Sequence, residues 1–183
     1  MKGLVFTEFL EMVESRFSPA MVDDIIDDAD LPSDGAYTSV GTYPHSEMLA
    51  LVESLSKNLN VAIPELIRLF GHHLFHSYVM HHSTLFEGKQ DVFDFLEQLE
   101  HLHRIEVHKL YPDAVFPTFR AIRTEKYKLL LTYQSHRPFA QLAKGLIEGC
   151  LEYYQVEAKI ETIDHSAGKG THVDFHITRT DME

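Results

Sequence analysis

The chain has 183 residues and carries 28 acidic against 16 basic side chains, so its formal net charge at pH 7 is −12 with the 13 histidines neutral. Because 44% of its residues are apolar and only 24% are charged, it has enough apolar material for one domain with a sizeable core, which excludes a disordered chain. The acidity disfavours nucleic acid and anionic membranes as partners, since the attraction to phosphate needs a basic surface.

The cysteine count and the first residues limit the compartment. Cys150 is the single cysteine, which excludes an internal disulfide framework and a cysteine-rich zinc site. The first apolar stretch contains Glu8, Glu11 and Glu14, so we expect no secretion signal, and no run of 18 apolar residues is long enough to span a membrane. These features predict a protein of the reducing cytoplasm.

The first 110 residues show helical patterns. Apolar residues recur at helical spacing in 4–13, and Ser18-Pro19 opens a second helix with the same spacing. A loop over 31–47 precedes a third helix, which we expect to begin with Ser46 as its N-cap and to run to about Lys57. Further patterns predict a helix from Pro64 to about His81 and one long helix over 91–110.

The last third changes to a strand pattern. Residues 119–122 and 126–135 predict a hairpin, and 156–163 and 171–178 predict two further strands, with a helix beginning at Pro138 in between. The fold class is therefore α+β, with N-terminal helices followed by a four-stranded antiparallel sheet and one inserted helix, and we expect 1–183 to form a single domain.

A histidine lies inside the apolar stripe of the long helix expected over 91–110. A neutral imidazole at this position, His103, can offer a nitrogen to a metal centre in an apolar cavity. Spacing alone fits equally a core histidine that donates to a backbone carbonyl. His101 and His108 fall off the stripe, so we expect both to be solvated.

A second candidate is the stretch Tyr-Gln-Ser-His-Arg at 133–137. On a strand, Tyr133, Ser135 and Arg137 would share one face, where two hydroxyls and a guanidinium suit a carboxylate or a phosphate. An ordinary strand end with a solvated arginine is the alternative. An axial histidine together with such a clamp is what a haem with two propionates requires.

Taken in order, these stretches resemble the H-NOX (haem nitric oxide/oxygen binding) family, which is related to the haem domain of soluble guanylate cyclase. The resemblance covers nearly the whole chain. It is carried by MKGLVFTEFLEMVE, GAYTSVGTY, LIRLFGHHLF, HLHRIEVHKLYPDAVFPTF, YQSHR and GLIEG, of which YPDA-x-x-P-x-F and Y-x-S-x-R are the most specific.

The resemblance implies haem b (iron protoporphyrin IX) buried between the N-terminal helices and the rest of the domain. It implies that His103 is the proximal iron ligand, that Tyr133, Ser135 and Arg137 hold the propionates, and that Pro117 presses on the porphyrin. It also implies a distal part over about 1–62 and a proximal part over about 63–183. His103 and Tyr111 enclose seven residues where the family usually has six, so we expect a helical bulge after the ligand.

The distal side is expected to select the gas. Oxygen-binding members carry a tyrosine where this chain has Leu142, so no hydrogen-bond donor is expected there. Bound dioxygen needs such a donor more than nitric oxide or carbon monoxide does. The other residues expected to line the apolar pocket are Val5, Phe9, Leu74, Tyr78 and Leu146, each of which would also suit plain core packing.

The resemblance therefore implies a non-enzymatic sensor of nitric oxide, which also binds carbon monoxide. Gas binding would weaken the bond to His103 and shift the N-terminal helices, which carry Val5 and Phe9, relative to the C-terminal half. With no output domain in 183 residues, the expected partner is a separate histidine kinase or a cyclic-di-GMP enzyme.

Two alternatives come from other classes of protein. The histidines over 72–82 place His72 and His76 four residues apart, a spacing that suits a shared divalent metal, and a hydrolase using this helix with Asp or Glu residues is one alternative. We expect the pair to lack a nearby carboxylate and to be solvated. A haem-free domain that binds another carboxylate through Arg137 is the other alternative. A C-terminal zinc site of the kind some relatives carry is expected to be absent, because HSAGKGTHVDFH contains no cysteine.

Overall fold

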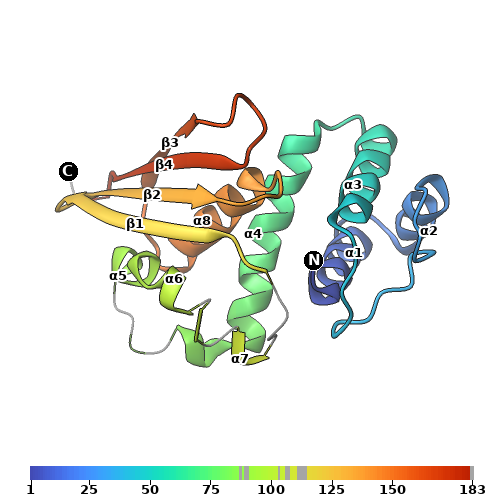
Figure 1. Cartoon of the computed structure of the whole chain (residues 1–183), viewed down its shortest axis with the longest axis horizontal. Coiled ribbons are helices and arrows are strands. Elements are labelled where there is room, and N and C mark those ends of the chain that lie inside the picture. The colour runs from blue at the N-terminus through green and yellow to red at the C-terminus, as the bar shows by residue number, and fades with distance from the viewer. Residues whose placement is uncertain (87, 89–90, 103, 106–107, 111–114, 182–183) are drawn as a thin grey trace.

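The computed structural model describes residues 1–86, 88, 91–102, 104–105, 108–110 and 115–181. Helices come first, as far as Leu110, and a four-stranded antiparallel sheet with one inserted helix follows from Thr118, which confirms the predicted α+β class. In Figure 1 the long helix α4 lies between the sheet and the N-terminal helices. Across these ranges, no helix is both long enough and apolar enough to cross a bilayer.

The N-terminal helices are α1 (Gly3–Arg16), α2 (Pro19–Asp28) and α3 (His45–Leu59). Ser18 caps α2 as expected, its hydroxyl accepting a hydrogen bond from the Met21 amide at 3.1 Å. The expectation that Ser46 caps α3 was wrong, because Pro44 stands at the N-cap and the helix begins at His45. The proline ring restricts φ to a value (−58°) that leads directly into a helical turn.

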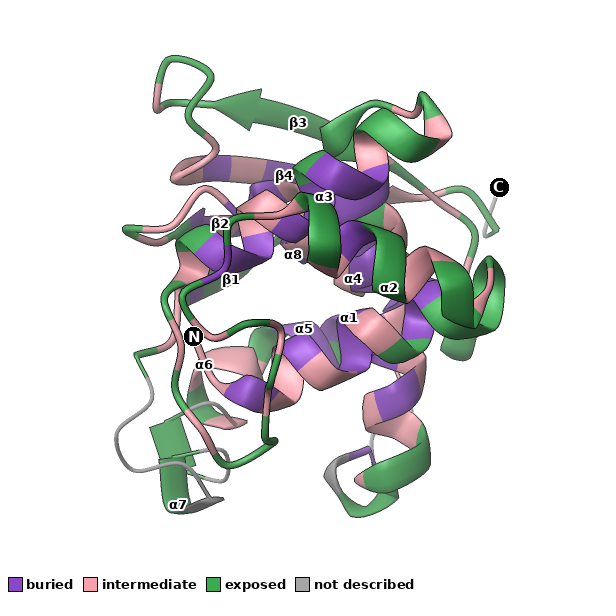
Figure 2. Ribbon diagram, turned by 90° about the vertical axis from the view of Figure 1, so that its right-hand side faces the viewer, coloured by how far each residue is buried: buried purple, intermediate pink, exposed green. Residues whose placement is uncertain are grey.

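Helix α4 (Ile63–His81) agrees with the prediction and takes part in two hydrophobic cores. One face of α4, with Leu66, Phe70 and Leu74, packs with α1, α2 and α3 in what we call the N-terminal core. Phe75, on another face, belongs to the C-terminal core of the sheet, α5 and α8. The buried stripes that form the two cores are purple in Figure 2.

The expectation of a single long helix over 91–110 was wrong for the described part of that range. After a short 3-10 turn η1 (Ser83–Leu85), the chain forms α5 (Val92–Glu97), α6 (Leu99–Leu102) and α7 (His108–Leu110). Side chains of this stretch are bound by β1 instead: the Glu100 carboxylate accepts a hydrogen bond from the Phe119 amide at 2.9 Å, and Arg123 pairs with Asp94 and Glu97. Tertiary contacts of this kind override the helical periodicity.

The sheet has the strand order β1-β2-β4-β3. Its strands are β1 (Thr118–Glu125), β2 (Lys128–Gln134), β3 (Ala158–Asp164) and β4 (His172–Arg179), which confirms the four expected strands. Alternate residues of β2 and β4 are buried and pair across the ladder, as Leu131 does with Phe175. Helix α8 (Ala140–Tyr153) contributes Ile147, Cys150 and other apolar residues to the same core.

Helices α4 and α8 approach each other backbone to backbone. A Cβ atom on Gly71 would lie 2.2 Å from the Leu142 carbonyl oxygen, and one on Gly145 would lie 2.0 Å from the Arg68 carbonyl oxygen. One on Gly149 would lie 2.9 Å from the Phe75 Cβ. Only residues without a side chain allow this approach, so the three glycines fix how closely the two helices pack.

We therefore expect Gly145→Ala to lower the free energy of unfolding by about 1–3 kcal/mol, because the added methyl group forces the two backbones apart. Urea unfolding followed by circular dichroism measures the change. Lys144→Ala, on the neighbouring position of α8, is the matched control and should change the free energy of unfolding by less than about 0.5 kcal/mol. Equal stability of Gly145→Ala and the wild type would contradict the close contact.

Candidate functional site

Tyr133, Ser135 and Arg137 gather at the end of β2. Tyr133 is on the strand, but β2 ends at Gln134, so the expectation that all three share a strand face was wrong. The Ser135 hydroxyl accepts a hydrogen bond from the Arg137 amide at 3.0 Å, and the Tyr133 hydroxyl donates one to the Arg137 carbonyl at 3.2 Å. A serine side chain that hydrogen-bonds to the backbone two residues later forms a turn, and Pro138 follows this turn.

Arg137 is half-buried at this turn. Within the described ranges, no carboxylate lies within ion-pair distance of it. Its charge acts on its surroundings, because the pKa of His45 is lowered by burial and then by Arg137. Burial also raises the pKa of Tyr133, which keeps the phenol protonated and able to donate. The turn is thus a set of donors with a positive charge.

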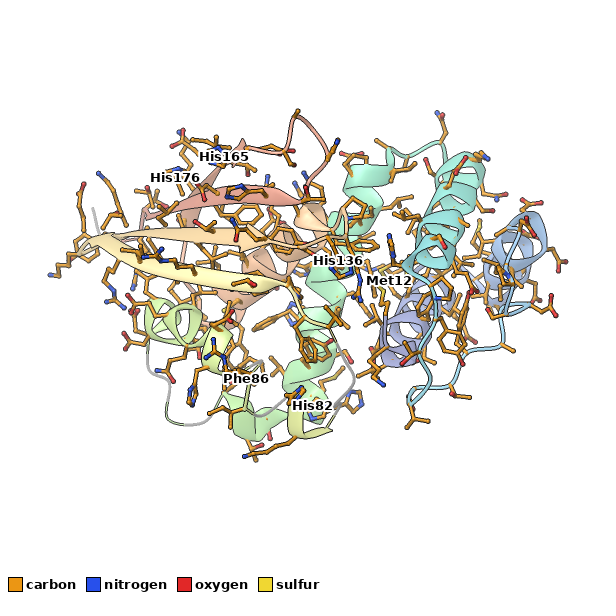
Figure 3. All side chains as sticks on the ribbon, viewed as in Figure 1. Met12, His82, Phe86, His136, His165 and His176 are labelled. Atoms are coloured by element: carbon orange, nitrogen blue, oxygen red, sulfur yellow. The ribbon has the colours of Figure 1, made fainter. Side chains whose placement is uncertain are left out.

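This turn lies where the two cores meet. Tyr133 belongs to the C-terminal core, whereas Phe139, six residues later, belongs to the N-terminal core. The Phe139 ring contacts the imidazole of His45, at the start of α3, edge to face at 6.3 Å between centroids. In Figure 3, His136 is drawn at the α4 end of the sheet. The donors therefore lie at the boundary between the sheet and the N-terminal helices.

The apolar residues expected to line a pocket come together from α1, α4 and α8. Phe9 and Leu74 are members of the N-terminal core, and Val5 and Leu142 pack against it. Two more, Tyr78 and Leu146, pack against both cores. These six side chains thus share the N-terminal core, and Tyr78 and Leu146 also reach the C-terminal core.

Pro117 lies directly before β1, half-buried. It lines a pocket of about 230 Å³ together with Glu100, Arg104, His108 and residues next to it. His103 lies outside the described residues. The backbone of Arg104 and Ile105, which follow it, is π-helical, and a π-helical turn is the type of local irregularity expected after the ligand. His101 and His108 are exposed, as predicted.

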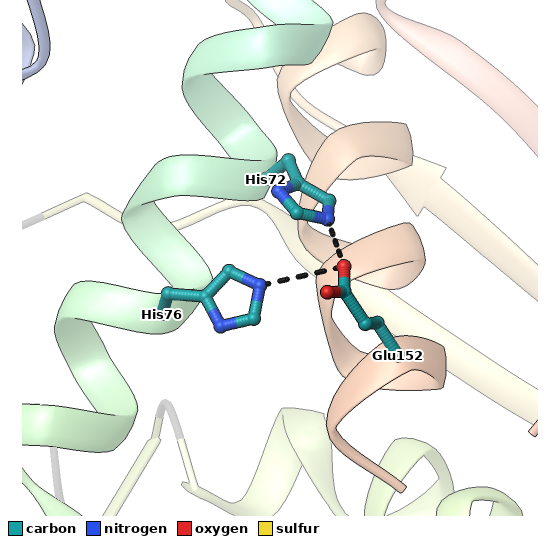
Figure 4. A group of neighbouring side chains, drawn as sticks. All are labelled: His72, His76 and Glu152. Carbon is teal, nitrogen blue, oxygen red and sulfur yellow. Dashed lines mark hydrogen bonds and ion pairs between the residues drawn. The ribbon is translucent and has the colours of Figure 1, made fainter. Parts of the chain in front are cut away.

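The sequence interpretation missed one partner of the histidine-rich helix. The expectation that His72 and His76 lack a nearby carboxylate was wrong, because Glu152 of α8 lies beside both. Its Oε2 atom is 2.6 Å from the Nε2 atom of His72 and 3.6 Å from that of His76 (Figure 4). Glu152 follows His76 by 76 residues, and only the three glycines at the α4–α8 contact could have suggested the pairing.

Fold and site together define an α+β domain with a cluster of hydrogen-bond donors where two apolar cores meet, and comparison with known proteins identifies the family. Residues 2–162 match the model of a family described as Haem-NO-binding. The chain therefore belongs to the H-NOX family, whose members are haem-based gas sensors.

Solved structures agree with this assignment. A point mutant of the H-NOX protein from K. algicida, in its unliganded Fe(II) state, is 37% identical, with a TM-score of 0.93 over 100% of this chain and 98% of that one. The H-NOX protein of Shewanella woodyi, solved in an Fe(II)CO state with IWP-051 bound, is 39% identical, with a TM-score of 0.82 over 99% and 95%. An H-NOX protein from S. oneidensis in the Fe(II)NO state is 23% identical, with a TM-score of 0.90 over 99% and 100%, and is similar in fold.

The donor set at the end of β2 fits the cofactor of this family. Haem carries two propionates, and a guanidinium without a carboxylate partner next to two hydroxyls is the chemistry that binds them. The apolar side chains of α1, α4 and α8 lie in or against the N-terminal core, and Tyr78 and Leu146 also reach the C-terminal core, so a flat apolar ring next to them would be shielded from water. The residues present therefore suit haem at both its polar and its apolar ends.

We expect Arg137→Gln to lose haem roughly tenfold to a hundredfold faster than the wild type, since a hydrogen bond to a charged group contributes about 1.5–3 kcal/mol. Transfer of haem to an excess of apomyoglobin measures the rate. Arg137→Lys keeps the charge without the planar fork, so its rate of haem loss should lie between those of the wild type and Arg137→Gln. The matched control is Arg120→Gln, an exposed arginine of β1, and equal rates for both glutamine variants would contradict the role of Arg137.

Proposed function

We propose that this chain is a sensor that takes nitric oxide, and also carbon monoxide, as ligand at the ferrous iron of haem b. In this proposal His103 holds the iron from the proximal side and the turn residues Tyr133, Ser135 and Arg137 hold the propionates. Pro117 presses against the porphyrin. Membership of a family of haem-based sensors supports the cofactor, and the donor turn supports its orientation.

Haem supplies a ferrous iron that takes a diatomic gas, and the protein decides which gas stays. The observation that carries the choice of nitric oxide is the apolar character of the distal residues. Leu142 offers no hydrogen-bond donor, and it packs against the N-terminal core, which contains Phe9 and Leu74. Dioxygen needs a donor to stabilise the charge that it gains on binding, whereas nitric oxide depends on one much less.

The chain is proposed to convert binding into movement between a distal part, residues 1–62, and a proximal part, residues 63–183. The two hydrophobic cores support such a division, because α1 to α3 pack in one core and the sheet packs in the other. Val5 and Phe9 of α1 would shift with the distal part when the population of states changes. We assign the chain no catalytic step.

We propose that another protein reads this movement. Following the family resemblance, we propose a histidine kinase or a cyclic-di-GMP enzyme as the partner. We place both in the cytoplasm, because a single cysteine, Cys150, buried in the C-terminal core, suits a reducing compartment.

Loss of the proposed iron ligand gives a direct test. Purified His103→Ala should lack the intense Soret band of the wild type, and added imidazole should restore the band, because the free ring replaces the missing ligand. Absorption spectra before and after adding imidazole measure both effects. His101→Ala and His108→Ala, which remove exposed histidines nearby, are the controls and should keep the band.

The same measurements separate the two alternatives. A colourless wild-type protein would contradict the haem proposal, and bound zinc in that colourless protein would favour the hydrolase. A haem-free carboxylate-binding domain would be favoured by a different result. In a titration, a carboxylate ligand would bind His103→Ala as tightly as the wild type but would fail to bind Arg137→Gln.

The choice of gas is tested at Leu142. The ferrous wild type should change its Soret band with nitric oxide and with carbon monoxide, but not with air. Leu142→Tyr should acquire a change in air, because its hydroxyl adds the missing donor, whereas the matched control Leu142→Phe adds only the ring and should not. A stable change of the wild-type band in air would contradict the proposal.

A further inference from the structure

The contact between α4 and α8 has a group of side chains that the gas-sensing site does not use. Figure 4 shows His72 and His76 of α4 with Glu152 of α8, the rings and the carboxylate pointing toward one another. Their three ligand atoms all lie within 4.8 Å of one another. Among the residues that the structure describes, this is the one group of three or more His, Cys, Asp or Glu side chains close enough to share a metal ion.

We propose that His72, His76 and Glu152 form a binding site for a divalent transition metal ion, with zinc as the favoured ion. Two imidazoles and one carboxylate are a ligand set that zinc accepts, with a water molecule in the fourth position. Borderline-soft zinc prefers imidazole, whereas calcium and magnesium prefer sites made of oxygen alone. The net charge of −12 also favours a cation.

Helix geometry explains why the three side chains converge. His72 and His76 are four residues apart, so both lie on one face of α4, with ring centroids 4.8 Å apart. Gly145 and Gly149 bring the backbone of α8 against Arg68, His72 and Phe75. Glu152 is three residues beyond Gly149, so its carboxylate reaches the rings across the contact.

The side chains are able to close around an ion. Ligand atoms around a tetrahedral zinc are about 3.3 Å apart, so the 2.6 Å contact between His72 and Glu152 has to open slightly. The side chains of His72, His76 and Glu152 are 29%, 39% and 62% exposed, which leaves room for rotation and for an ion to enter. A second ion pair between the two helices, from Arg68 to Glu148 at 3.2 Å, uses neither histidine.

An ion in this site would tie α4 to α8. Helix α4 also carries Leu74 and Tyr78, and helix α8 also carries Leu142 and Leu146. All four residues lie in or against the N-terminal core. Bound metal would therefore restrain the two helices that line the distal pocket. The site itself depends only on the contact between the helices and not on which gas the protein binds.

The test is zinc binding to the purified, haem-loaded protein after treatment with a chelator. Equilibrium dialysis against Zn²⁺, with zinc and iron counted by elemental analysis, should give one saturable zinc per chain. His76→Gln and Glu152→Gln should each weaken binding by at least about tenfold, since zinc loses one of three protein ligands. At the same zinc concentration, the Tm of the wild type should rise more than that of Glu152→Gln, because stabilisation of the native state grows with the affinity for the ion.

The matched control is His165→Gln. His165 also contacts a carboxylate, with 2.8 Å between its Nε2 atom and Oδ2 of Asp174, and Figure 3 shows it at the β3–β4 edge of the sheet. Its loss should leave zinc binding unchanged. Equal weakening by His76→Gln and His165→Gln would assign zinc to scattered surface histidines and overturn the proposal, as would the absence of saturable binding. Unchanged Soret bands and circular dichroism in the variants exclude misfolding as the cause.

Discussion

Helices α4 and α8 touch through their backbones because Gly71, Gly145 and Gly149 place no side chain between them. Larger residues would hold the helices at the usual separation of 8–10 Å or more. The contact joins the two hydrophobic cores, since α4 contributes to both and α8 packs on the sheet. Helices α1, α2 and α3 pack with α4, so their positions relative to the sheet depend on this contact.

The candidate site lies at the boundary that this contact creates. The turn after β2 is bonded by its own side chains, so the Arg137 guanidinium is left to meet an anion. Phe139 continues from that turn into the N-terminal core, while Tyr133 belongs to the core of the sheet. An anionic cofactor held there would contact both halves of the molecule, which is the arrangement that a sensor needs if binding is to move one half relative to the other.

Local patterns in the chain were sufficient where local forces decide the structure. The caps and periodicity of 19–28 and 63–81 predicted α2 and α4, and the alternation in 126–135 and 171–178 predicted paired strands. The pattern failed over 91–110, where the carboxylates of Glu100 and Asp94 bond to residues of β1. Helical spacing carries no information about such partners, because they are brought close by the tertiary fold.

The sequence by itself determined the α+β class and the net negative charge, because each follows from composition or from spacing along one element. It also identified the donors of 133–137 and apolar residues that lie in or against the N-terminal core. The tertiary structure decided that Ser135 and Arg137 form a turn rather than a strand face. It also decided that Glu152 meets His72 and His76. Both depend on how closely separate elements pack, and that separation is set by contacts between residues far apart in the chain, which periodicity does not encode.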